Sequence, residues 1–243
     1  MTMKATLLVP SVLALALLTA CGGEGPAATQ PPASQPPAPA ESQAPAEVVS
    51  DLPVLSWVAD RDAVPDFLSP ELQALYLRAV SVRWIYDMNT DTIDSFPLAD
   101  GSLPDLSEAY ETIAMGEQDY FLARGRYAQW ADFSAMVGSI FTPSLTVELL
   151  HSDLVAPTED GRTAFVSAGR GANAFYDMET PDSFTLLESN DDYIVFLRTA
   201  HYVEPMTDDQ GNSLGDFPYT RDAFVRMEHT DLGWRVAELE LPY

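Results

Sequence analysis

The chain has 243 residues, and its 37 acidic residues against 12 basic ones give a formal net charge of −25 at pH 7. This charge argues against nucleic acid as a partner, because phosphate binding needs basic surface. It also argues against attraction to anionic lipid headgroups. A basic protein, or a protein with a basic groove, would be attracted instead. Solubility alone is the other interpretation of the same charge.

The first 20 residues predict a secretory signal, in which Lys4 precedes an apolar run over residues 5–18 and small residues precede Cys21. The run is shorter than the roughly 20 residues that a transmembrane helix needs, and Pro10 interrupts it. Leu18-Thr19-Ala20-Cys21 resembles the lipobox of bacterial lipoproteins. That resemblance implies cleavage before Cys21, lipidation of its thiol and a lipid anchor in the cell membrane on the extracytoplasmic side. An ordinary signal peptide with a chance cysteine is the alternative.

Residues 21–50 are rich in Pro, Ala, Gln and Ser, most clearly over residues 30–39. Such a segment has too few large apolar side chains to offset the entropy that ordering would cost. It is predicted to be a disordered tether, and proline-rich linkers extend by about 3.1 Å per residue. An SH3-type ligand is the other interpretation of the prolines. Cys21 is the single cysteine, so no disulfide is expected.

Residues 51–243 are predicted to form one domain with its own hydrophobic core, since their number suits a single domain. This part of the chain holds 34 acidic residues against 11 arginines. Its first predicted element is a helix over residues 69–89. Ser69 can cap this helix, Pro70 suits the first helical position, and Glu71 lies at the positive end of the helix dipole.

Beyond this helix the pattern predicts a loop, short strands, two helices and then longer strands. The expected elements are a loop over 90–105, strands over 111–115 and 118–126, helices over 132–140 and from 142, and a hairpin of 154–159 with 162–167 around Asp160-Gly161. They continue with a loop over 169–173, strands over 183–189 and 193–203, a polar turn over 206–215, and strands over 217–229 and 234–241. This order predicts an α+β domain, in which a curved antiparallel meander sheet holds the N-terminal helices on one face.

The order of these elements resembles the IseA family of secreted bacterial inhibitors of cell-wall DL-endopeptidases. The resemblance covers most of residues 69–243 and rests on order and spacing rather than on one specific motif. The matching segments are 74–79, 119–122, 141–145, Leu149-Leu150, Gly161, 169–173 and 233–236. The chain departs from the family pattern in the acidic loop 90–105 and in the turn 206–215, which leaves the identity of the partner open.

The resemblance implies a cystatin-like or NTF2-like fold and a non-catalytic function. The domain would dock an acidic surface or loop into the substrate groove of an NlpC/P60-type peptidoglycan endopeptidase and block it without being cleaved. Lipidation would hold this inhibitor near the membrane. Because such folds carry many functions, a small-ligand binding domain with an apolar cup on its curved sheet is the alternative.

Three loops are the candidate partner-facing segments of the domain. They are the glycine-rich loop with Gly169, Arg170, Gly171 and Asn173, the pair Asp191 and Asp192, and the pair Asp208 and Asp209. Oxygen-rich loops can bind calcium, but neither aspartate pair has the EF-hand spacing. Asp, Asn and Gly are also favoured in hairpin turns, which is the interpretation preferred for both pairs.

Motifs that predict catalysis are missing from the sequence. It contains no Gly-x-Ser-x-Gly, no His-Glu-x-x-His and no phosphate-binding glycine loop, and lipidation would occupy the single thiol. His151, His201 and His229 lack metal-ligand spacing, so structural roles are predicted for them and no metal or cofactor is expected. A pair of carboxylates suited to acid–base chemistry does not stand out. An enzyme with a distributed acid–base site is the third hypothesis.

Overall fold

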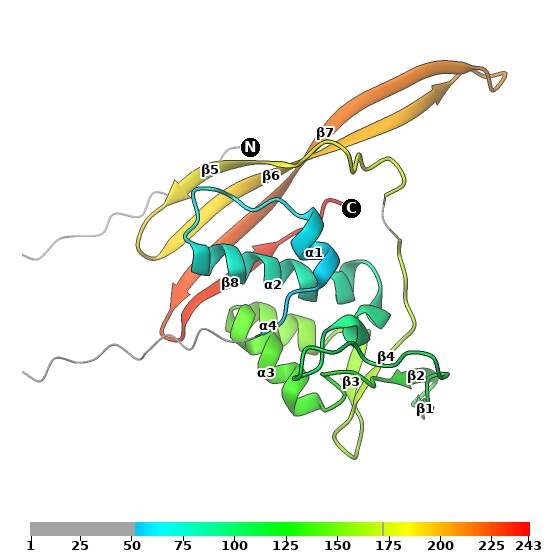
Figure 1. The fold of residues 1–243 in the computed structure, drawn as a ribbon, viewed down its shortest axis with the longest axis vertical. Helices are drawn as coiled ribbons and strands as arrows, with labels where there is room; N and C mark the ends of the chain where they lie inside the picture. The colour runs from blue at the N-terminus through cyan, green and yellow to red at the C-terminus, as the bar shows by residue number, and fades with distance from the viewer. Residues whose placement is uncertain (1–51, 172) are drawn as a thin grey trace, which may run out of the picture. The chain divides into compact units, whose positions relative to one another are not determined.

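The computed structural model describes residues 52–171 and 173–243 of the protein (Figure 1), which belong to one compact unit. The predicted signal peptide over 1–20, the lipidation of Cys21 and the tether over 21–50 lie outside the described residues. None of the helices that the structure describes is long and apolar enough to cross a membrane.

The helices gather in the first half of the domain. They are α1 (Ser56–Arg61), α2 (Pro70–Asp87), the 3-10 helix η1 (Thr90–Ser95), α3 (Trp130–Ile140) and α4 (Pro143–Leu150). The predicted start of α2 is confirmed, because the Ser69 side chain accepts a hydrogen bond from the backbone N–H of Leu72 and Pro70 occupies the first helical position. The sequence did not predict α1, which with six residues is too short to show hydrophobic periodicity.

A first sheet is built from four short strands. They are β1 (Thr112–Met115), β2 (Gln118–Leu122), β3 (Val155–Pro157) and β4 (Thr163–Phe165), in the order β1-β2-β4-β3, with all neighbours antiparallel. The β1–β2 and β3–β4 hairpins confirm the two predicted turns. Gly116 and Gly161 have φ of 69° and 84° there, a backbone conformation that side chains with a Cβ rarely adopt.

A second sheet is a four-stranded antiparallel meander. Its strands are β5 (Ser183–Ser189), β6 (Tyr193–Thr207), β7 (Ser213–Thr230) and β8 (Gly233–Leu239), in sequence order. Helix α2 contacts β8, and one hydrophobic core includes side chains from the helices and from both sheets, among them Tyr76, Phe165, Phe196 and Val225.

The α+β class is confirmed, but the prediction of a single meander sheet is wrong, because the strands form two sheets. After β4 the chain runs from residue 166 to 182 without a strand, and its ladder-type contacts there are the isolated bridges Asn89↔Gly169 and Tyr176↔Tyr202. The early hairpins therefore pair with each other, and β5 starts a new sheet. Local turn signals predict hairpins but contain no information about which hairpins share a sheet.

Strands β6 and β7 are longer than predicted, and the turn between them is shorter. The prediction ended the first strand at Val203 and began the second at Phe217, whereas the ladder continues to Thr207 and restarts at Ser213. The additional residues are mostly exposed. They therefore lack the alternation of buried and exposed side chains by which a strand is recognised.

Candidate functional site

The outer part of the β6–β7 hairpin, residues 203–219, extends beyond the rest of the second sheet (Figure 1) and is called the arm below. The pairing of β5 with β6 ends at Thr199, and the pairing of β8 with β7 ends at Val225. The arm is therefore a two-stranded ribbon with exposed residues on both faces. Long two-stranded ribbons bury little apolar surface, so the arm adds little to the stability of the core.

One face of the arm has a row of aromatic and apolar side chains that begins at the buried Tyr202 and becomes exposed toward the tip. The register pairs Tyr202 with Tyr219, Glu204 with Phe217, and Met206 with Gly215, which places these side chains on one face. The rings of Tyr202 and Tyr219 stack with centroids 5.0 Å apart, and Phe217 lies 6.4 Å from Tyr219. Phe217 is 53% exposed and Met206 40%. Exposed apolar side chains gathered beside acidic ones are typical of binding surfaces.

The arm is also acidic. Residues 203–219 include four acidic residues and no Lys or Arg, the acids being Glu204, Asp208, Asp209 and Asp216. Asp208 Oδ1 accepts hydrogen bonds from the backbone N–H groups of Gln210 and Asn212, at 2.9 and 2.8 Å. The Asn212 side chain donates to the other oxygen, and these bonds lower the pKa of Asp208. Asp208 thus fixes the turn at the tip of the arm and keeps its negative charge there.

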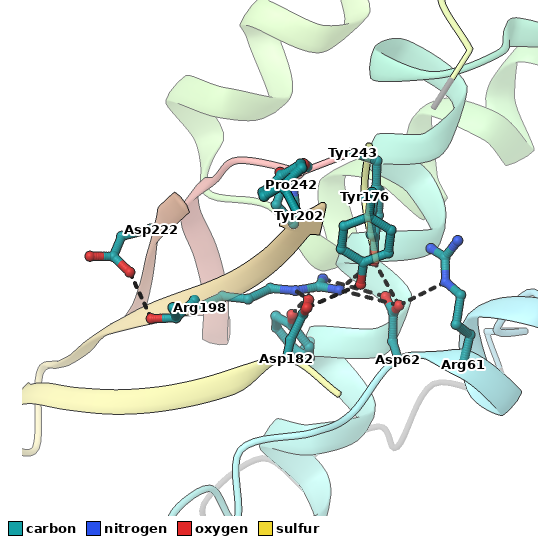
Figure 2. Close-up of polar contacts among 11 residues, drawn as sticks. Arg61, Asp62, Tyr176, Asp182, Arg198, Tyr202, Asp222, Pro242 and Tyr243 are labelled. Atoms are coloured by element: carbon teal, nitrogen blue, oxygen red, sulfur yellow. Dashed lines mark hydrogen bonds and ion pairs between the residues drawn. The ribbon is translucent and has the colours of Figure 1, made fainter. Parts of the chain in front are cut away.

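A buried ionic cluster lies at the base of the arm, on the inner half of β6 (Figure 2). Arg198 is only 1% exposed. Its Nε donates to Asp182 at 2.6 Å, and its two Nη atoms donate to Asp62 at 3.3 and 3.5 Å and to the Tyr76 hydroxyl at 3.1 Å. One guanidinium therefore joins three segments that are far apart in the sequence.

Tyr243 closes the cluster from the end of the chain (Figure 2). Its hydroxyl donates to Asp62 at 2.6 Å and accepts a hydrogen bond from Arg198. Its ring stacks on Trp84 with centroids 5.3 Å apart, and the Arg61 guanidinium carbon lies 4.3 Å from the ring centroid. Burial raises the pKa of Tyr243, so its hydroxyl stays protonated and keeps donating to Asp62.

The cluster is connected directly to the first residues of the arm. Tyr176 donates from its hydroxyl to Asp182 at 3.1 Å, and its ring packs edge-on against Tyr202 with centroids 5.8 Å apart. Burial, followed by the charge of Asp182, raises the pKa of Tyr176 to about 12. The Tyr202 hydroxyl donates to the carbonyl of Pro242. We therefore assign the cluster a positioning function, because Arg198 is shielded from solvent while its partners fix the strand from which the arm extends.

The two predicted aspartate pairs both lie in hairpin turns, but at opposite ends of β6. Asp191 and Asp192 belong to the β5–β6 turn, where the Asn190 side chain accepts from the backbone of Asp192 at 2.9 Å. Asp208 and Asp209 belong to the tip of the arm. The 15 residues of β6 span about 50 Å at roughly 3.3 Å per residue. The pairs therefore do not form one surface, and only the second belongs to the arm.

The glycine-rich loop lies near the end of α2 rather than on the arm. Gly169 forms an isolated bridge with Asn89, and the backbone N–H of Arg170 donates to the carbonyl of Met88 at 2.7 Å. Gly171 has a φ of 68°, and the Asn173 side chain accepts from the backbone of Phe175 at 3.0 Å. The loop leads the chain into residues 175–177, which hydrogen-bond to β6 at the base of the arm.

The three histidines lie on different elements. His151 caps the end of α4, His201 lies on β6, and the ring of His229 on β7 packs edge-on against Trp234 with centroids 5.3 Å apart. Over residues 52–171 and 173–243, no group of three or more His, Cys, Asp or Glu side chains is arranged to hold a metal ion.

Among the described residues, the exposed arm is the strongest candidate for function.

Sequence reasoning missed both the ionic cluster and the aromatic face of the arm, although one signal was present. Along β6 the inward-facing positions are Ile194, Phe196, Arg198, Ala200 and Tyr202, all buried. An arginine in the inward series of an otherwise apolar strand predicts buried carboxylate partners.

No protein-family model matches the chain, and no curated protein matches it. The resemblance to the IseA family therefore stays a prediction, and the function has to be argued from the geometry of the arm and its base.

Proposed function

We propose that the protein is an extracytoplasmic, non-catalytic binding domain, anchored to the membrane through Cys21, that inhibits a cell-wall peptidoglycan hydrolase by inserting its arm into the substrate groove. One observation carries the proposal. The arm presents Phe217 and Met206 to solvent and carries four acidic residues and no Lys or Arg.

The apolar side chains of the arm would supply most of the binding energy. Full burial of a Phe or Met side chain contributes about 1.5–3 kcal/mol, and aromatic anchors dominate protein interfaces. The acidic residues around them would favour a groove with a basic rim and would speed the encounter at low salt. Phe217 and Met206 are therefore the proposed anchors, and Asp208 and Asp209 the proposed contacts with basic side chains.

A hairpin in a substrate groove also explains how the inhibitor could avoid cleavage. Both strands of the arm are held in one ladder from Tyr193↔Glu228 to Met206↔Gly215 without a register shift, so neither strand is free to lie in a groove as a single extended chain. The resemblance to the IseA family supports a DL-endopeptidase of the NlpC/P60 kind as the target. It also supports a cystatin-like or NTF2-like plan for the second sheet and its helices.

The alternative function, a small-ligand cup on the sheet, has less support. The face of the second sheet that meets the helices is filled by the domain's own side chains. Tyr76, Phe196, Arg198 and Tyr202 are each at most 1% exposed there. A ligand would have to displace both the hydrophobic core and the ionic cluster.

The proposal is tested by adding residues 47–243, the compact unit, to a purified NlpC/P60-type endopeptidase that is digesting peptidoglycan. We expect inhibition at low salt that weakens at moderate salt, because salt screens the attraction between acidic arm and basic groove. Unchanged digestion rates at both salt concentrations would refute the proposed target. Inhibition that is insensitive to salt would refute the electrostatic part of the mechanism.

A further inference from the structure

Each strand of the arm contains a proline, Pro205 in β6 and Pro218 in β7. The register pairs Pro205 with Asp216 and Pro218 with Val203. Proline has no backbone N–H, so a strand tolerates it only where that position faces away from the neighbouring strand. The direction in which each proline faces therefore determines which edge of the arm lacks a donor.

Pro205 lies on the outer edge of β6. The backbone N–H of Val203 donates to the carbonyl of Phe175, and the carbonyl of His201 accepts from Asp177, at 2.7 and 2.8 Å. Odd-numbered residues of β6 thus direct their polar backbone groups away from β7. Because these directions alternate along a strand, the nitrogen of Pro205 faces outward as well.

Pro218 lies on the outer edge of β7. The carbonyl of Phe224 accepts a hydrogen bond from the backbone N–H of Glu240 on the far side of β7, at 3.4 Å. Even-numbered residues of β7 therefore direct their polar backbone groups away from β6. The ladder has no register shift between Phe224 and Pro218, so Pro218 faces outward and neither proline removes a hydrogen bond from the arm.

Both outer edges of the arm are otherwise open to pairing. In the described part of the chain, the outer edge of β6 is covered by β5 and residues 175–177 only as far as Val203, and that of β7 by β8 and Glu240 only as far as Phe224. Unpaired strand edges are templates for another strand, and proline is one way in which proteins block them. The first uncovered outward position on β6 is Pro205, and on β7 Pro218 is the first outward position within the arm, after Asp222 and Thr220 at its base.

We propose that Pro205 and Pro218 close both edges of the arm to strand addition, so that the arm binds its partner only through its side chains. The identity of the partner rests on the proposed function, but the closure of the edges does not. The occupant of the arm's aromatic face is then a protein groove with an apolar floor and a basic rim. A strand edge of a partner, or of a second copy of this chain, is excluded.

The test restores both donors with Pro205→Val and Pro218→Val in residues 47–243. Valine has a high strand propensity, and the ladder loses no hydrogen bond, so the variant is expected to keep its circular dichroism spectrum. Sedimentation at moderate salt, which screens the repulsion between acidic arms, should show a monomer for the unmodified domain and a doubled mass for the variant. Pro181→Val is the matched control, since Pro181 is exposed and lies outside the strands.

Amide hydrogen exchange separates edge pairing from other contacts. The outward N–H groups of Thr220 and Asp222 should exchange more slowly in the associated variant than in the monomeric control. A folded variant that stays monomeric would overturn the proposal, as would association without this protection. Thr replacements at both prolines serve as a second variant. The experiment contains no hydrolase, so its result tests the closure of the edges and does not depend on the proposed target.

Discussion

The inner and outer halves of the β6–β7 hairpin have opposite distributions of polar and apolar side chains. The inner half buries Arg198 at 1% exposure with two carboxylates, whereas the outer half exposes Phe217 at 53%. Elsewhere in β6–β8 the buried positions are apolar, as at Phe196, Val225 and Val236. Each reversal has a cost: a buried charge must be paired, and an exposed aromatic ring gains nothing from burial. The buried ion pairs of Arg198 hold the strands in position, which offsets the cost of burying the charge. The exposed Phe217 would be stabilised only by burial against a partner.

The largest effect on stability is expected for Arg198→Met at the base. The substitution leaves the buried Asp182 without its cation and Asp62 with Arg61 alone, at 3.3 Å, and breaking a buried ion pair costs about 3–5 kcal/mol. Urea unfolding of residues 47–243 measures the loss. Arg226→Met is the matched control, because Arg226 pairs with Glu228 at 2.7 Å on the exposed surface, where such pairs contribute about 0–1 kcal/mol. Equal losses in the free energy of unfolding would contradict the distinction between the buried and the exposed ion pair.

Tyr243→Phe should have the next largest effect. It removes the hydroxyl that donates to Asp62 and accepts from Arg198, and hydrogen bonds to charged groups contribute about 1.5–3 kcal/mol. Tyr219→Phe on the arm is the control, because the Tyr219 hydroxyl makes no hydrogen bond among the described residues, and we expect its free energy of unfolding to be unchanged. A loss as large as that of Tyr243→Phe would show that the arm contributes to folding.

Buried and exposed carboxylates should respond to pH with opposite signs. Burial raises the pKa of Asp94, although the backbone N–H groups of Gly125 and Arg124 donate to it at 2.7 and 2.9 Å. Its contribution to stability is therefore greatest below the ordinary Asp pKa of about 4 and is lost as the pH rises through the raised value. Asp208 has a lowered pKa, so its contribution is present above about pH 4 and is lost as the pH falls through the lowered value.

The measurement compares Asp94→Asn and Asp208→Asn with the unmodified domain by urea unfolding across the acid range. Asp94→Asn should gain stability relative to the unmodified domain as the pH rises from about 4. Asp208→Asn should gain stability relative to the unmodified domain as the pH falls below about 4. Parallel curves for all three proteins would mean that neither carboxylate is perturbed by folding.

The smallest effect on stability is expected for Phe217→Ser on the arm. Phe217 is more than half exposed, and surface substitutions usually change the free energy of unfolding by no more than about 0.5 kcal/mol. Thermal unfolding followed by circular dichroism is sufficient to check this. A large destabilisation would mean that the arm packs against other parts of the domain and is not a free ribbon.

The secondary structure could largely be predicted because its signals are local. Ser69 and Pro70 mark the start of α2, and the pair Asp160-Gly161 marks a hairpin, and both predictions are confirmed. The division into two sheets and the cluster at Arg198 could not be predicted in this way. They depend on contacts between distant residues, such as Asp62 and Arg198, which are 136 positions apart.

The candidate site was predicted only in part. Charge and turn residues predict Asp208 and Asp209, which lie at the tip of the arm. No local pattern predicts Phe217 and Met206, because their importance depends on how far the hairpin extends beyond its neighbours. The length of the extension is set by the residues at which β5 and β8 stop pairing with the hairpin. The sequence of the arm itself contains no information about those residues.

The central claim, that the arm is the binding surface, is tested most directly by comparing two double variants that each replace two exposed apolar side chains with serine. One carries Phe217→Ser and Met206→Ser on the arm. The other carries Leu186→Ser and Leu187→Ser on β5, where the leucines are 43% and 50% exposed. The Kd for a purified NlpC/P60-type endopeptidase is measured for each. Loss of two anchors should raise the Kd by at least about 30-fold, the equivalent of one interface hot spot, while the β5 variant keeps the original Kd. Equal Kd values for the two variants would contradict the claim.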